Sequence, residues 1–104
     1  MNRAALMTIT LSCFFVALSG CGGPPQIGAD RDSFKAVDAL YTAVSLRDSK
    51  LVGQCEANLK GLRDSSKIPQ AAFSSLHSII AEANDGKWES ALDRLTVFME
   101  GQSR

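Results

Sequence analysis

The feature that most constrains this 104-residue chain is an apolar run near its start, residues 4–18, which only Thr and Ser interrupt. A short basic segment, Met1-Asn2-Arg3, precedes the run, and residues 20–25 hold three glycines and two prolines. A membrane-spanning helix needs about 20 apolar residues, and these glycines and prolines would break a helix where a span has to continue. The run therefore fits poorly as a transmembrane helix or as a buried core helix.

The order of a basic segment, an apolar run and small residues is that of a secretory signal. Here it ends in Leu18-Ser19-Gly20-Cys21, which resembles the lipobox of bacterial lipoprotein precursors. In that family the cysteine thiol receives diacylglycerol, signal peptidase cuts before the cysteine, and the new amino group is acylated, for example with palmitate. The resemblance implies that residues 1–20 are a signal peptide and that Cys21 is the lipidated N-terminus of the mature protein. Cleaved secretion without lipid and an uncleaved anchor are the alternatives.

The residue after the cysteine bears on which membrane holds the protein. An Asp at that position resembles an inner-membrane retention signal of enteric bacteria, and this chain has Gly22 instead. The resemblance therefore favours the outer membrane, with the protein facing the periplasm.

Cleavage and lipidation would also decide how many of the three cysteines stay free in the mature protein. Cys13 would leave with the signal and Cys21 would carry lipid, so only Cys55 would remain and no intrachain disulfide could form. The precursor has 11 basic and 11 acidic residues, a balance that argues against nucleic-acid binding, which needs a dominant basic surface. So short a chain forms one small domain with a limited core, which argues against a large enzyme cleft.

Residues 21–31 are rich in Gly and Pro and have no hydrophobic periodicity, so we expect a flexible tether there. Ten such residues would hold a domain roughly 15 to 20 Å from the lipid. The remaining residues, 32–104, carry apolar stripes of helical period. They predict an all-α domain of four short helices in two antiparallel hairpins.

The predicted helices begin near Asp32 or Ser33, after the turn at residues 47–50, at Pro69, and near Lys87. Their stripes predict the core: Phe34, Val37, Leu40, Tyr41 and Val44; Leu51, Cys55, Leu59 and Leu62; Phe73, Leu76, Ile79, Ile80 and Ala83; Trp88, Ala91, Leu92, Leu95, Phe98 and Met99. The first and third stripes align at a constant offset of 39 residues. The segment from Ala81 to Leu95 resembles the junction between tetratricopeptide units, but the likeness covers only one junction.

The sequence offers no convergent catalytic or metal-binding set. His77 is the only histidine, and with Cys55 it falls short of the four ligands that zinc takes. Glu82, Asp85, Glu89 and Asp93 lie three and four apart with Lys87 and Arg94 among them, which indicates a solvated face with local ion pairs. We therefore predict no metal, no cofactor other than the covalent diacylglycerol and N-acyl lipid at Cys21, and no enzymatic activity.

The function that these patterns favour is a membrane-anchored interaction or scaffold module with an unidentified protein partner. Tyr41 and Trp88 are the candidate interface residues, because large aromatic side chains anchor many interfaces. The alternative is a carrier of a small apolar ligand or lipid, in which Phe34, Tyr41, Phe73 and Trp88 would line a pocket. Cys55 falls on an apolar stripe and is predicted to be a structural, unreactive thiol.

Overall fold

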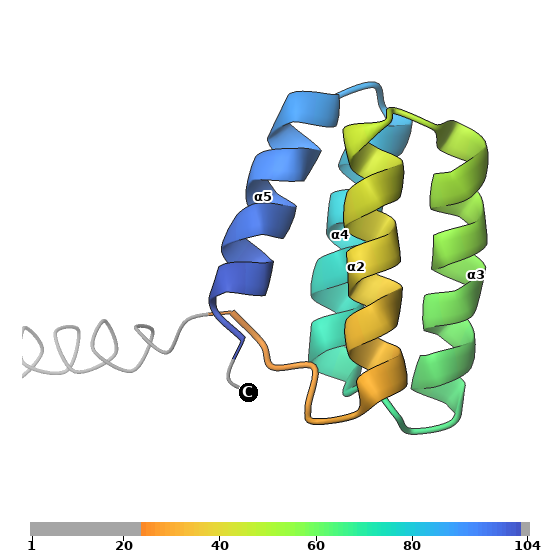
Figure 1. The fold of residues 1–104 in the computed structure, drawn as a ribbon, viewed down its shortest axis with the longest axis vertical. Helices are drawn as coiled ribbons and strands as arrows, with labels where there is room; N and C mark the ends of the chain where they lie inside the picture. Colours follow the sequence, from red (N-terminus) through yellow and green to blue (C-terminus); the bar gives the residue numbers. More distant parts are fainter. Residues whose placement is uncertain (1–23, 103–104) are drawn as a thin grey trace, which may run out of the picture.

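A computed structural model of the chain describes residues 24–102, so the predicted signal peptide and Cys21 lie outside the described residues. Four helices make up the domain: α2 (Arg31–Ser45), α3 (Ser49–Asp64), α4 (Gln70–Asn84) and α5 (Trp88–Glu100). Helices α2 and α3 form one hairpin and α4 and α5 a second, while α2 also contacts α5 and α3 contacts α4 (Figure 1). The four helices thus close a ring around one core, which confirms the predicted all-α pair of hairpins. No helix among the described residues is long and apolar enough to cross a membrane.

The core follows the predicted stripes with some additions and one exception, Tyr41, which is exposed although it lies on a predicted stripe. Side chains from all four helices fill it, and those buried as predicted are Val37, Leu40, Val44, Leu59, Leu62, Phe73, Leu76, Ile79, Ile80, Ala83, Ala91, Leu95 and Phe98. Small or loop residues that the stripes omitted are also buried: Ile27, Ala36, Ala43, Val52, Ile68 and Ala72. Phe34, Leu51, Cys55, Trp88, Leu92 and Met99 pack against this core and are only partly buried.

Helix starts differ from the prediction by one or two residues. Helix α2 begins at Arg31 because Asp30, rather than Asp32 or Ser33, is its N-cap and accepts a hydrogen bond from Ser33 N at 3.0 Å. Asp48 caps α3 in the same way, through a 3.1 Å bond from Leu51 N. Carboxylates at these positions satisfy amides that have no partner within the helix.

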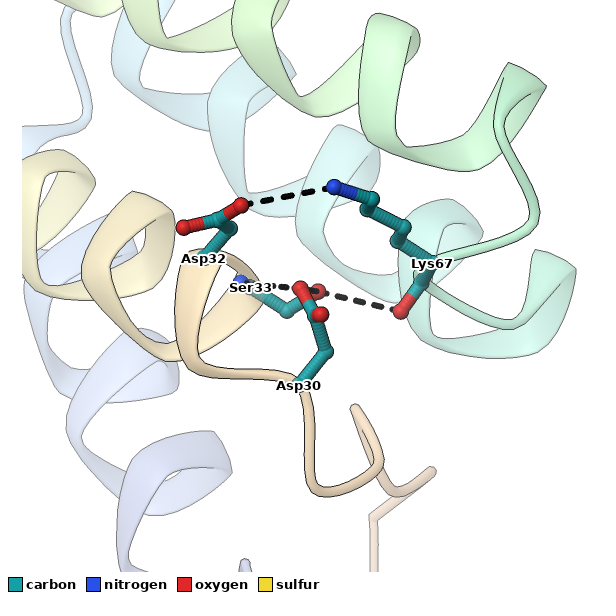
Figure 2. Close-up of polar contacts among 4 residues, drawn as sticks. All are labelled: Asp30, Asp32, Ser33 and Lys67. Atoms are coloured by element: carbon teal, nitrogen blue, oxygen red, sulfur yellow. Dashed lines mark hydrogen bonds and ion pairs between the residues drawn. The ribbon is translucent and has the colours of Figure 1, made fainter.

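Ser33 joins the first helix to the loop between the hairpins. Its side chain is fully buried, and its hydroxyl lies 3.0 Å from the carbonyl oxygen of Lys67 and 3.2 Å from Asp30 Oδ2 (Figure 2). The Lys67 ammonium meets Asp32 at 3.4 Å on the surface above this contact (Figure 2). The contact is partly buried, and Ser33 supplies the donor that a loop carbonyl shielded from water needs.

The prediction of a flexible tether through residue 31 is wrong for residues 24–31. Ile27 is 1% exposed and belongs to the core. Its N–H donates to Gln102 Oε1 at 2.8 Å, and Gln102 Nε2 donates in turn to Pro25 O at 3.0 Å and Phe98 O at 2.9 Å. The burial of Ile27 and the hydrogen bonds to Gln102 together outweigh the preference of glycine and proline for irregular, flexible conformations. Residues 24–31 therefore pack beside the end of α5 (Figure 1).

Candidate interaction seam

Two aromatic side chains of α2, the partly buried Phe34 and the exposed Tyr41, lie on one flank of the helix. Phe34 and Tyr41 are seven residues apart, which brings them to nearly the same angle around the helix axis. Phe34 lines a small hollow together with Met99 of α5. This flank of α2 therefore turns toward α5, and Tyr41 on it is 37% exposed.

Helix α5 presents a matching flank. Trp88, Leu92 and Met99 recur at spacings of four and seven, and all three are partly buried against the core. The opposite flank of α5 carries Arg94, which pairs with Glu82 of α4. Because α4 lies on the Arg94 side, the Trp88 flank faces α2.

The two flanks form one surface feature, the α2–α5 seam, which consists of Phe34, Tyr41, Trp88, Leu92 and Met99. It combines three aromatic side chains with a methionine, residue types that are enriched at protein interfaces. The hollow within it measures only about 10 Å³, too small for a ligand. The seam suits a shallow contact with another macromolecule, and the two predicted interface residues lie on its two sides, Tyr41 on α2 and Trp88 on α5.

The aromatic pocket predicted for a ligand carrier does not form as a unit. Phe73 belongs to α4, where the Arg63 guanidinium lies 4.4 Å from its ring centroid and His77 stacks on it at 5.6 Å. Of the four predicted lining residues, only Phe34 borders either of two well-formed hollows within residues 24–102. The order of the helices in the ring explains this result. Phe73 belongs to α4, which lies diagonally opposite α2.

His77 lies at the surface, as its position beside the apolar stripe predicted. Its side chain is half exposed, and Nε2 lies 3.0 Å from Glu56 Oε2 of α3. Together with Arg63 above Phe73, this contact links α3 to α4 across the bundle surface. No nucleophile accompanies His77 in these contacts.

The predicted solvated face with ion pairs is confirmed at Glu82. Its carboxylate accepts hydrogen bonds from Ser90 Oγ and from the Arg94 guanidinium. These two bonds hold the pKa of Glu82 below its ordinary value. Arg94 also donates to Ser78 Oγ at 3.2 Å, so the cluster is a cross-helix clamp between α4 and α5.

Cys55 is a free thiol that is neither fully buried nor fully exposed. It packs against the core beside Leu51, on the same flank of α3. Burial raises the pKa of the thiol above its ordinary value of 9.0. Cys55 was predicted to face the core between the hairpins, and it is only partly buried there. Its raised pKa agrees with an unreactive thiol.

Between residues 24 and 102, no three His, Cys, Asp or Glu side chains come close enough together to hold a metal ion. Comparison with known proteins finds no matching family model, no similar curated protein and no similar solved structure. The features of this chain that bear on function are therefore its N-terminal sequence and the α2–α5 seam.

Proposed function

We propose that this chain is a bacterial envelope lipoprotein whose helical domain is a non-enzymatic interaction module. Lipid on Cys21 anchors the mature protein, and the domain binds a protein partner through the α2–α5 seam. The single observation that supports the binding role is the seam itself, in which Tyr41 keeps 37% of its surface exposed beside three other large apolar side chains and Trp88. Burying such a surface against a partner removes apolar area from water.

The anchoring half of the proposal is tested at Cys21. Wild-type protein should take up labelled fatty acid and partition with membranes, because more than one acyl chain holds a protein firmly to a bilayer. Cys21→Ser should accumulate as unprocessed precursor without label. Equal labelling of the two proteins would refute lipidation at this residue.

The binding half is tested by photocrosslinking in living cells. A photoreactive phenylalanine analogue at position 41 should crosslink to a discrete partner that mass spectrometry identifies. The same analogue at position 46 is the control, because Leu46 is 64% exposed but lies outside the seam, in the turn after α2. Equal crosslinking at both positions, or none at position 41, would rule out the seam as the binding surface.

A carrier of a small apolar ligand or lipid is the alternative. A carrier would hold a lipid-like molecule after purification, which native mass spectrometry of the domain detects. Finding such a molecule in stoichiometric amount would favour the carrier over the interaction module.

A further inference from the structure

The start of the described chain is fixed to the end of α5. Gln102 clamps Pro25 and Ile27 through its side-chain amide, as described above, and Gln26 Nε2 donates to Gly101 O at 2.9 Å. Pro24 lies so close to Gly101 that a Cβ added there would stand 2.4 Å from Pro24 Cγ. Pro24 therefore has a defined place on the domain surface.

This fixed point limits how far Cys21 can be from the domain. Only Gly22 and Gly23 lie between Cys21 and Pro24, and an extended chain covers at most about 11 Å over these three Cα–Cα steps. A free tether of ten residues would have allowed roughly 15 to 20 Å. Lipid on Cys21 would thus hold the Pro24 end of the bundle directly at the bilayer.

A groove opens beside Pro24, between α4 and α5. Its apolar lining is Pro24, Ile79, Val97 and Phe98, and Ser75, Asp93 and Arg94 complete it; its volume is about 320 Å³. Val97, in the last turn of α5, is 62% exposed. Burying this exposed valine together with the apolar hollow beside it would remove apolar surface from water, which is favourable.

We propose that this α4–α5 groove is the surface that contacts the lipid bilayer. The inference rests on the proposed lipidation of Cys21, because the short link from Cys21 to Pro24 is what brings the groove to the membrane. Val97 enters the interface between headgroups and acyl chains. The two hairpin turns lie at the end of the bundle opposite Pro24 (Figure 1), and they are the part of the domain farthest from the lipid anchor.

Charge indicates what kind of lipid contact this is. Basic and acidic side chains nearly balance at this end of the bundle; they are Arg31, Lys35, Lys60, Arg63 and Lys67 against Asp30, Asp32, Asp64 and Glu100. Polybasic segments bind anionic lipid because they carry a large excess of positive charge. Contact through the groove therefore depends on apolar burial and not on anionic lipid.

The same orientation leaves the α2–α5 seam accessible. The groove lies on the Arg94 flank of α5 and the seam on the Trp88 flank. A domain that contacts the bilayer through the groove keeps the Trp88 flank of α5 open to a partner in the surrounding compartment.

The experiment compares two equally exposed apolar positions at opposite ends of the bundle. Val97 and Leu46 are 62% and 64% exposed, and each is changed to Cys in lipidated, processed Cys55→Ala protein. An environment-sensitive fluorophore on each cysteine is read in phosphatidylcholine vesicles that carry a quencher on the acyl chain, and again after addition of phosphatidylglycerol. Mass spectrometry of each sample establishes lipid on Cys21.

We expect several-fold stronger quenching at position 97 than at position 46, with little change on adding phosphatidylglycerol. In Gln102→Ala protein the difference should shrink, because residues 24–27 lose their clamp. Equal or absent quenching at position 97 in protein that carries the lipid would overturn the inference and leave the anchor intact. Protein without lipid on Cys21 would overturn both the inference and the proposed anchoring.

Discussion

Arg47 and Gly86 occupy equivalent positions in the turns of the two hairpins and share a left-handed backbone, with φ of 54° and 84°. Arg47 N donates to Val44 O and Asp48 N to Ala43 O; 39 residues later Gly86 N donates to Ala83 O and Lys87 N to Glu82 O. These paired bonds are those of a Schellman motif, which ends many helices. The offset of 39 residues that links the apolar stripes therefore extends to the backbone of the turns.

The first prediction concerns the cost of a side chain in that conformation. A left-handed backbone strains a residue with a Cβ by about 1 kcal/mol, and glycine escapes this strain. Arg47→Gly should raise the free energy of unfolding of the domain by about 1 kcal/mol, and Gly86→Arg should lower it by a similar amount. Urea denaturation followed by circular dichroism measures both. Arg47→Ala is the control, since it removes the same charge but keeps the Cβ and should give no gain.

The second prediction uses the N-caps of the same repeat. Asp48 caps α3, whereas the equivalent residue before α5 is Lys87, which makes no side-chain capping bond. Lys87→Asp should stabilise the domain by about 1 kcal/mol, through a new cap and a favourable charge at the helix start. Thermal denaturation compares it with Lys87→Ala, which removes the positive charge without supplying a cap. Equal melting temperatures for the two variants would show that the backbone before α5 does not admit the cap.

The third prediction tests the buried hydroxyl of Ser33. Ser33→Ala leaves the partly buried Lys67 carbonyl without the donor that lies 3.0 Å from it, and the loss of one such hydrogen bond costs about 1 kcal/mol. We expect a loss of stability of that size by urea denaturation, although alanine is the better helix former. Ser45→Ala, at an exposed position near the end of α2, should be neutral or slightly stabilising. A Ser33→Ala variant as stable as wild type would mean that water replaces the hydroxyl.

The fourth prediction follows the lowered pKa of Glu82. Because Ser90 and Arg94 favour the ionised carboxylate in the fold, this contact stabilises the domain above the ordinary pKa of a glutamate and is lost as the pH falls through the lower folded pKa. In Arg94→Gln the pKa of Glu82 should rise toward its ordinary value, which NMR titration of the side-chain carboxyl measures. Asp93→Asn, next to Arg94 in the sequence, is the control and should leave the titration of Glu82 nearly unchanged.

Periodicity predicted the helices and most of the core because it depends on local spacing, which a bundle preserves. Periodicity failed to predict the contact between Ile27 and Gln102, which are 75 positions apart. The spacing of apolar residues contains no information on a hydrogen bond between the two ends of the domain. Tyr41 and Trp88 were identified by residue type alone. That they share a seam with Phe34 and Met99 depends on which helices are neighbours, and this emerges only from the fold.

The last prediction concerns Cys55, the single cysteine between residues 24 and 102. Partial burial raises the pKa of its thiol, so less thiolate, the reactive form, is present in the folded protein. The folded domain should react with maleimide more slowly than the same domain in denaturant at the same pH. As the pH rises, the thiol of Cys55 loses its proton in the unfolded state before it does so in the folded state. The free energy of unfolding of wild type should therefore fall relative to that of Cys55→Ala as the pH rises through the ordinary thiol pKa of 9.0 toward the higher folded pKa. Labelling as fast in the folded as in the unfolded state, or a dimer that reductant dissolves, would instead identify Cys55 as an accessible, reactive thiol.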